Sequence, residues 1–214
     1  DPAEIPVPGS LGAEHTDPPP FIGRLKGALA RGVANRTYVH PYAVDEQEAR
    51  ESIALTYGMI SMVDDGIGRI LAKLNGLGLA ENTIVIYSSD HGDVMGDHGI
   101  MLKHGLHTEG VIRMPMIWAD PEAQAGQRSD MLASAIDFMP SVLARAGLQP
   151  FTGVQGVDVV GLVQEGRQPD RTGVIIEADE LPENVDVEDF FKVRTFTDGR
   201  WRMTLWVEED FGEL

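Results

Sequence analysis

The sequence predicts an α/β sandwich with a largely parallel sheet flanked by helices, and a small antiparallel sheet near the C-terminal end. Helix-like and strand-like segments alternate through the middle of the chain, and this alternation favours a parallel sheet. The central strand-like runs are short and rich in valine and isoleucine, as buried strands are. Beyond about residue 168 the pattern changes to strands joined by turn signals, which indicates an antiparallel unit.

Composition and charge exclude several classes of partner. The 214 residues are 43% hydrophobic, include no cysteine and carry a formal net charge of −17. Nucleic acids and anionic membrane surfaces both require basic side chains, so we expect neither as a partner. The absence of cysteine excludes disulfides, a thiolate nucleophile and a zinc–thiolate site. No apolar run approaches the roughly 20 residues that cross a bilayer, so we expect a soluble chain, periplasmic or cytoplasmic.

The first 44 residues form the first of three predicted regions. Residues 1–44 hold seven of the thirteen prolines, including Pro18-Pro19-Pro20, without sustained periodicity. This pattern predicts an irregular arm laid over another surface. A free-standing arm of this length is uncommon, so we expect it to pack on something missing from this chain, whose two ends both look like cuts.

Residues 45–167 are predicted to form the α/β core and to open with a long helix. Asp45 and Glu48 make a capping-box pattern at its start, and Gly76 and Gly78 provide the stop signal. Apolar residues recur at helical spacing between these points, which predicts one face packed in a core. The positions expected in that core are Ile53, Tyr57, Met59, Ile60, Met62, Val63, Ile67, Ile70, Leu71 and Leu74.

The remaining elements follow from shorter signals. Thr83–Ser88 and Met114–Trp118 are predicted as buried strands, and a helix is expected from about Ser134 to Ala146. Residues 168–214 are predicted to form a small antiparallel subdomain. Its elements are a strand at 174–178 and a hairpin of 192–197 and 200–207, turned by the two residues Asp198-Gly199.

The predicted strand end at residue 88 carries the chemistry. Asp90 and His91 follow the strand directly, where α/β proteins place their ligands. A carboxylate beside an imidazole can share a divalent cation: oxygen donors favour calcium or magnesium, and an imidazole extends the choice to manganese or zinc. The Lys103 ammonium can grip an oxyanion. A cation together with an ammonium predicts a site for a charged tetrahedral ester.

Less specific interpretations remain open for each of these residues. An isolated Asp-His-Gly also occurs as a polar turn at a strand end. His98 is expected to be structural and to hydrogen-bond the loop backbone. His104 and His107 can face a substrate or occupy solvated loop positions, and Arg113 is expected to brace the loop through a salt bridge.

Several sequence runs around this strand end match a known family pattern. They are S-S-D-H-G-D-x-M-G-D-H-G at 88–99, the lysine at 103 and E-G-V-I-R-M-P at 109–115. On these residues the chain resembles the sulfatase family of the alkaline phosphatase superfamily. The run at 57–71 looks like the family helix before this strand, and D-P-A-E-I-P-V-P at 1–8 is similar to the stretch after the family's Pro-His-x-Pro segment. The resemblance implies an alkaline-phosphatase-like sandwich.

The resemblance also implies roles for individual residues. Asp90 and His91 correspond to the second pair of metal ligands, and Lys103 to the lysine that contacts an oxygen of the sulfate ester. Calcium is then the expected metal, with manganese or zinc as alternatives. Many family members have asparagine where this chain has His91, which leaves the metal open and is compatible with relatives that hydrolyse phosphonate or phosphate esters.

The departure from the family pattern concerns the nucleophile. The family uses a Cys or Ser in Cys/Ser-x-Pro-x-Arg, oxidised to formylglycine, and this chain has no cysteine and no Ser-x-Pro-x-Arg. The family's first metal-binding aspartates and its upstream catalytic His and Lys precede the region covered here. The chain therefore looks like the C-terminal half of a sulfatase. We expect it to be inactive alone and to associate with the missing N-terminal half or with itself through an exposed apolar face.

The expected function is hydrolysis of a small-molecule sulfate monoester by the parent protein, which would be an arylsulfatase-like sulfuric ester hydrolase. Two alternatives remain: a phosphonate or phosphate ester hydrolase on the same scaffold, and a non-catalytic module that keeps the fold without its nucleophile. The natural substrate depends on loops elsewhere and is left open by the sequence.

Overall fold

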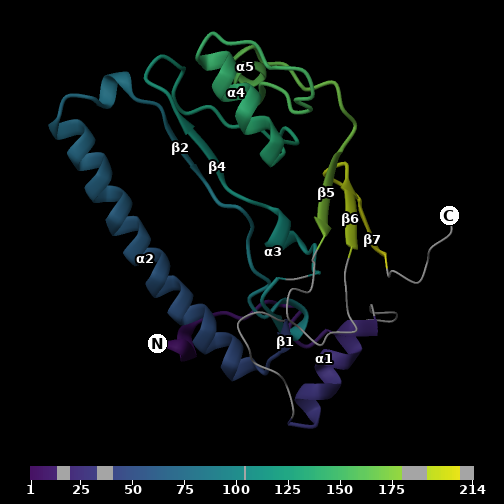
Figure 1. The fold of residues 1–214 in the computed structure, drawn as a ribbon. Coiled ribbons are helices and arrows are strands. Elements are labelled where there is room, and N and C mark those ends of the chain that lie inside the picture. Colours follow the sequence, from purple (N-terminus) through teal and green to yellow (C-terminus); the bar gives the residue numbers. More distant parts are fainter. Residues whose placement is uncertain (14–19, 33–40, 104, 180–191, 208–214) are drawn as a thin grey trace.

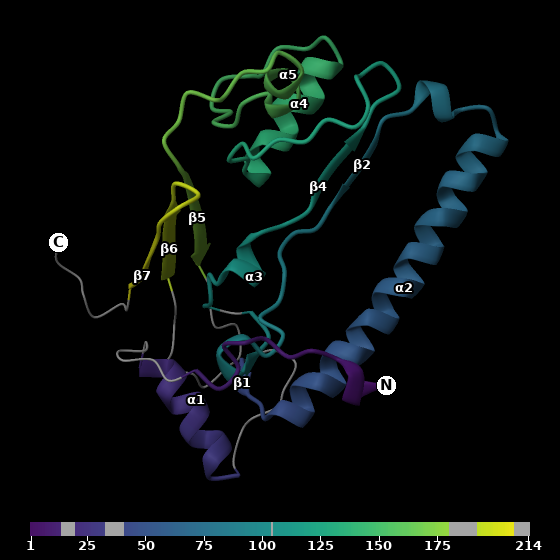
Figure 2. The ribbon, with the colours of Figure 1, turned by 180° about the vertical axis from the view of Figure 1, so that it is seen from behind.

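The computed structural model describes residues 1–13, 20–32, 41–103, 105–179 and 192–207. Its elements follow one another along the chain (Figures 1 and 2). They are η1 (Pro2–Glu4), α1 (Pro20–Ala30), β1 (Tyr42–Ala43), α2 (Glu46–Gly76), η2 (Ala80–Asn82), β2 (Val85–Ser88), η3 (Asp97–Gly99), β3 (Ile100–Met101), α3 (Glu109–Ile112), β4 (Met116–Ala119), η4 (Ala135–Asp137), α4 (Phe138–Arg145), α5 (Val159–Gln164), β5 (Val174–Asp179), β6 (Lys192–Thr197) and β7 (Arg202–Val207).

The long helix α2 begins and ends where its sequence signals predict. The Glu48 N–H donates to Asp45 Oδ1 at 2.9 Å and the Asp45 N–H donates to Glu48 Oε2 at 3.1 Å, which completes the capping box. At the other end Gly78 has a φ of 69°, its N–H donates to the Asn75 carbonyl, and the Leu79 N–H donates to the Leu74 carbonyl. This is a Schellman motif, which satisfies carbonyls that the helix itself leaves unpaired.

The apolar face of α2 does not lie in a core, and this part of the prediction was wrong. Only Ala49 and Ile53 of the helix are buried. The part of the helix that follows Ile53 runs apart from the strands (Figures 1 and 2). The exposed apolar residues of α2, which we call the α2 face, are Leu55, Tyr57, Met59, Ile60, Met62, Val63, Ile70 and Leu71. The helical periodicity is present, but among the described residues no element buries this face.

The two central strands pair antiparallel. Val85 of β2 lies opposite Ala119 of β4, and Ser88 lies opposite Met116. All strand pairs among the described residues are antiparallel, so the largely parallel sheet expected from the alternation is not found in this part of the chain. A parallel return needs a crossover, usually a helix. The connection from β2 to β4 contains the short elements η3, β3 and α3, and its one described α-helix, α3, has only four residues.

The N-terminal region is more ordered than predicted and packs on this chain itself. It contains the helix α1, which the proline-rich composition did not suggest. Ile22 of α1 joins a buried cluster with Val94, Ile100, Leu106 and Val111. Arg50 of α2 donates to the carbonyl of Ile5, which fixes the first residues against α2. The described part of the arm therefore covers the loop between β2 and β3.

An ion pair ties the end of β4 to helix α4. The Asp120 side chain, 1% exposed, accepts from the Arg145 guanidinium, whose Nη2 lies 3.2 Å from Oδ1. The same guanidinium lies 3.0 Å from Glu122. The hydrogen bond from Arg145 lowers the pKa of Asp120 from 3.8 to about 2, against burial, which raises it. Asp120 therefore stays ionised well below its ordinary range.

A second buried carboxylate organises the helical layer around α4 and α5. Both oxygens of Asp137 accept from Arg171, at 2.6 and 3.0 Å, and also from the N–H groups of Ser134 at 2.7 Å and Val157 at 2.9 Å. Arg171 also donates to the Leu132 carbonyl. Burial raises the pKa of the Asp137 carboxyl, but Arg171 and the two N–H groups together lower it below its ordinary value.

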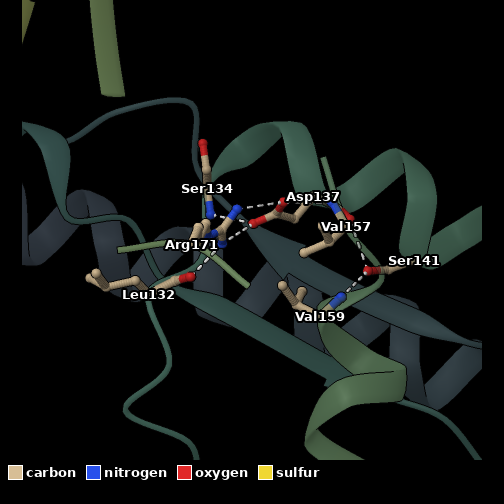
Figure 3. Close-up of polar contacts among 7 residues, drawn as sticks. All are labelled: Leu132, Ser134, Asp137, Ser141, Val157, Val159 and Arg171. Carbon is tan, nitrogen blue, oxygen red and sulfur yellow. Dashed lines mark hydrogen bonds and ion pairs between the residues drawn. The ribbon is translucent and has the colours of Figure 1, made fainter. Parts of the chain in front are cut away.

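The Asp137 backbone extends this network to the next helix (Figure 3). The Ser141 hydroxyl donates to the Asp137 carbonyl at 2.8 Å and accepts from the Val159 N–H at 3.1 Å. Helix α4 and the start of α5 are thereby held to one carboxylate and its neighbours. The predicted helix at 134–146 is confirmed as η4 followed by α4, whereas the short α5 had no sequence signal strong enough to predict it.

The C-terminal unit is the predicted small antiparallel sheet, in the order β5-β6-β7. The hairpin is confirmed, but its turn is longer than two residues because Thr197 pairs with Arg202. The loop is held by Asp198 Oδ1, which accepts from the Arg200 and Trp201 N–H groups at 2.8 and 2.6 Å. These hydrogen bonds, that of Trp201 first, lower the pKa of Asp198. No helix in the described residues has the length and apolar character needed to span a bilayer.

The buried Asp137–Arg171 pair yields the first prediction. Asp137→Asn replaces one carboxylate oxygen by an amide donor, so two of the four N–H groups lose their acceptor, and it removes the negative charge that faces Arg171. Removing one partner of a buried ion pair typically costs about 3–5 kcal/mol, so the urea midpoint should fall markedly. Asp130→Asn, at an exposed position, is the matched control and should leave the midpoint unchanged. Equal midpoints for the two variants would contradict the prediction.

Candidate active site at the end of strand β2

The end of β2 and the start of β4 meet beside an open cleft of about 2040 Å³. Ser88 Oγ donates to the Pro115 carbonyl at 2.9 Å, which holds the end of β2 to the start of β4 just before Asp90. Asp90, His91, Lys103 and His107 are among the residues that line this cleft. The structure thus brings the predicted Asp90, His91 and Lys103 into one place.

Hydrogen bonding sets the orientation of the His91 ring. Its Nδ1 lies 2.9 Å from the Gly92 carbonyl oxygen, which can only accept, so Nδ1 carries a proton. The other ring nitrogen, Nε2, then has its lone pair available in the neutral ring. A histidine that ligates a metal is fixed in the same way, by donating its second nitrogen to a carbonyl or carboxylate. His91 is therefore oriented to offer Nε2.

The Asp90 carboxylate lies next to that nitrogen. Its Oδ2 is 3.3 Å from His91 Nε2, and its side chain is 81% exposed, against 38% for His91. Its Oδ1 accepts from the His91 backbone N–H at 2.9 Å. That hydrogen bond lowers the pKa of Asp90, so the group is an anion at neutral pH. Two acceptors at this separation favour a cation between them.

Lys103 supplies a positive charge at the same point. Its Nζ lies 2.7 Å from His91 Nε2, and an ammonium can only donate, which agrees with a lone pair on that nitrogen. The loop that carries Lys103 is shaped by Asp93, whose Oδ1 accepts from the N–H groups of Met95 at 3.0 Å and Leu102 at 3.2 Å. Leu102 adopts a φ of 68°, so the backbone turns sharply just before the lysine.

Close backbone contact fixes the position of His91. The Gly92 N–H donates to the Val111 carbonyl at 2.8 Å. A Cβ on Gly92 would lie 1.9 Å from the Gly110 carbonyl oxygen, so no side chain fits there. The strand-end loop and α3 are thus in direct backbone contact. Glycine at 110 was not singled out from the sequence, although it follows Glu109 in the family-like run.

The N-terminal arm covers the far side of the same loop. Ser10 Oγ donates to Asp97 and accepts from the His98 N–H at 3.1 Å. A Cβ on Gly99 would lie 2.9 Å from the Leu11 carbonyl oxygen. His98 has a φ of 55°, a conformation that few non-glycine residues adopt. Ser10 therefore helps to hold this loop, a role that no pattern in the sequence suggested.

The other predicted residues have different surroundings. His107 is buried, and its Nδ1 lies 2.9 Å from Thr195 Oγ1 of the C-terminal sheet, so its substrate-contacting role stays a prediction. Arg113 forms the expected salt bridge, with Glu109 at 3.2 Å, and both side chains are exposed. His104 lies outside the described residues.

The donor set fits part of a metal site. A carboxylate oxygen and an imidazole lone pair beside each other suit a divalent cation. Within the described ranges, however, no group of three or more His, Cys, Asp or Glu side chains could hold a metal ion. Divalent ions of this kind take four or more ligands, so this part of the chain offers two of them.

Comparison with known proteins assigns the family. The family model described as Sulfatase matches residues 32–148. The chain belongs to the sulfatase family. It is 33% identical over 139 residues to the multifunctional alkaline phosphatase superfamily protein PehA of Trinickia caryophylli, covering 64% of this chain and 27% of that protein. It is 33% identical over 126 residues to an arylsulfatase of Clostridium perfringens, covering 57% and 26%.

A solved structure has the same fold as this sulfatase chain over part of its length. The phosphonate monoester hydrolase of Silicibacter pomeroyi aligns with a TM-score of 0.71 at 20% identity, covering 99% of this chain and 46% of the other. The α/β class is therefore that of the sulfatases and their alkaline-phosphatase-like neighbours. The chain spans about a quarter of the length of the two curated relatives described above.

The lack of space at Gly92 yields the second prediction. Gly92→Ala forces the new methyl group into the Gly110 carbonyl, so the loop must move away from α3. We expect a loss of about 1–3 kcal/mol in the free energy of unfolding, as for other overpacked sites. Gly58→Ala in α2, where nothing lies within 4 Å, is the control and should be neutral or stabilising by about 0.5–1 kcal/mol. Chemical denaturation of both variants measures these free energies of unfolding, and an unchanged value for Gly92→Ala would contradict the prediction.

Proposed function

We propose that the protein containing this chain is a sulfuric ester hydrolase of the arylsulfatase type, acting on a small-molecule sulfate monoester. The observation that carries the proposal is that Asp90 Oδ2 and Lys103 Nζ lie 3.3 and 2.7 Å from His91 Nε2, at one edge of the cleft. The family assignment supports the reaction class at the level of the family. The Clostridium relative that carries the name arylsulfatase supports it further.

Each of the three side chains has a proposed role. Lys103 donates to a non-bridging oxygen of the ester and stabilises the charge that these oxygens carry during transfer. Asp90 and His91 hold a divalent metal, calcium first, with manganese or zinc as alternatives. When bound, such a metal supplies Lewis-acid stabilisation of the ester oxygens. The Gly92 carbonyl keeps the His91 proton on Nδ1, so Nε2 carries a lone pair. A bound metal would take this lone pair in place of the Lys103 ammonium, which is then free to donate to the ester.

The remaining groups are proposed to lie elsewhere in the parent protein. The chain has no cysteine, so a formylglycine made from cysteine has to come from outside these 214 residues. We propose the division 1–44, 45–167 and 168–214, in which the middle part is half of an alkaline-phosphatase-like core with a larger parallel sheet. The α2 face is then the surface that packs on the missing N-terminal half. Self-association through this face is the alternative.

A phosphonate or phosphate ester hydrolase is the second candidate function. Two observations favour it: the fold match to a phosphonate monoester hydrolase, and an imidazole rather than an amide beside Asp90. A non-catalytic module is the third candidate. The first two are separated by the ratio of kcat/KM for an aryl sulfate and the matched aryl phosphonate on the full-length protein. The third requires that neither ester is hydrolysed.

Lys103 provides the third prediction. In the full-length protein, Lys103→Ala removes one charged donor to the ester, so kcat/KM for the better ester should fall by about 10²–10³-fold. Lys73→Ala, in the exposed last turn of α2, removes the same charge elsewhere and should leave kcat/KM unchanged. Full activity in Lys103→Ala would exclude the proposed role of this lysine.

The fourth prediction concerns the isolated chain. The 214 residues alone should show no turnover of an aryl sulfate with calcium, manganese or zinc present, because the nucleophile and the other ligands are absent from it. The control is the full-length protein under the same conditions. Measurable hydrolysis by the purified 214-residue chain would show that its own residues suffice.

A further inference from the structure

The C-terminal sheet touches the loop that carries Lys103, and nothing in the proposed function accounts for this contact. We call residues 103–108 the Lys103 loop; residue 104 lies outside the described part. Between described residues, two polar contacts join the loop to residues about 90 to 100 positions later in the chain. Trp206 Nε1 donates to the Gly105 carbonyl at 2.7 Å, and Thr195 Oγ1 lies 2.9 Å from His107 Nδ1.

These contacts come from one face of the sheet. Thr195 pairs with Thr204, and their hydroxyl oxygens are 2.8 Å apart; Trp206 pairs with Val193, two residues from Thr195 on β6. Directly paired residues share a face, as do residues two apart on a strand. Thr195 and Val193 are fully buried, so this is the face that packs inward. The same face therefore presents two hydrogen-bonding groups to the loop.

The packing around these contacts is tight. Trp206 packs against the buried cluster that contains Leu106 of the loop and Val111 of α3. His107 and Thr195 are 8% and 1% exposed, so their hydrogen bond is shielded from water. Buried hydrogen bonds hold geometry because breaking them leaves unsatisfied polar groups. Both contacts lie within four residues of Lys103, on its C-terminal side in the sequence.

We infer that Thr195 and Trp206 are positioning residues, which hold the Lys103 loop and so keep the Lys103 ammonium at the cleft edge beside His91. The sheet holds the residues after Lys103, and the hydrogen bond from the Leu102 N–H to Asp93 Oδ1 holds the residue before it. The backbone is then held on both sides of Lys103, so the Lys103 side chain stays at the cleft. This inference rests on the proposed role of Lys103 and adds a second unit of the chain to that site.

The fifth prediction tests the hydroxyl of Thr195 in the full-length protein. Thr195→Val keeps the shape and removes the hydroxyl, whereas Thr195→Ser keeps it. Thr197→Val is the matched control, because the Thr197 hydroxyl bonds only within the described β6–β7 turn, to Trp201 and Gly199. We expect Thr195→Val to speed amide hydrogen exchange at residues 105–112 by about five- to tenfold. It should lower kcat/KM by about 10–100-fold, as for other groups that orient a functional residue.

A double-mutant cycle with Lys103→Ala separates positioning from general destabilisation. If Thr195 acts through Lys103, then Thr195→Val should have no further effect on kcat/KM once Lys103 is alanine. Thr195→Ser and Thr197→Val should match the wild type in both measurements. Trp206→Phe, which removes the indole N–H, should behave as Thr195→Val does.

Each other outcome has a defined meaning. Unchanged exchange at 105–112 in Thr195→Val overturns the inference, whatever the activity. Faster exchange with unchanged kcat/KM, or a full additional loss in the Lys103→Ala background, overturns the positioning role. If the wild-type protein hydrolyses neither ester, the proposed function fails by itself, and the exchange measurement still decides whether the sheet holds the loop.

Discussion

The backbone contact between Gly92 and α3 is the constraint on which the candidate site depends. The Gly92 N–H bonds to the Val111 carbonyl, and the Gly110 carbonyl occupies the space where any side chain of residue 92 would begin. This contact sets where the chain leaves β2, and the Gly92 carbonyl in turn sets the tautomer of His91. Without the contact, Asp90 and His91 would lie on a polar turn with no fixed relation to Lys103.

The electrostatics of the site follow from that geometry. The Asp90 carboxylate and the His91 lone pair are both acceptors at short range, so each makes the other unfavourable unless a positive charge lies between them. Lys103 places a positive charge 2.7 Å from the His91 Nε2 lone pair. An ammonium has three N–H donors, so Lys103 can donate to His91 Nε2 or to the oxygens of an anion at this edge of the cleft. On a chain with a net charge of −17, the Lys103 ammonium is the positive charge that the proposed anionic ester would meet at this edge of the cleft.

The sequence predicted local structure well and distant contacts poorly, for a physical reason. The caps of α2, the hairpin of β6 and β7, and the joint placement of Asp90, His91 and Lys103 depend on neighbouring residues or on a short loop. The direction of β4 relative to β2 and the exposure of the α2 face depend on which segments pack together, which periodicity does not encode. The contact of Thr195 with His107 spans 88 positions and leaves no local pattern.

Under the proposed function, the exposed α2 face and the two-ligand donor set have the same explanation. A helix face of eight large apolar residues is stable only when covered, because burial of each such side chain contributes roughly 1.5–3 kcal/mol. A divalent ion similarly requires more donors than Asp90 and His91 supply in the described residues. Both needs would be met by one body of protein packed along α2 and over the cleft, because α2 residues such as Leu71 and Leu74 line the same cleft as Asp90 and His91. In the proposed parent protein, the cover for the α2 face and the remaining metal ligands would therefore lie in the same place.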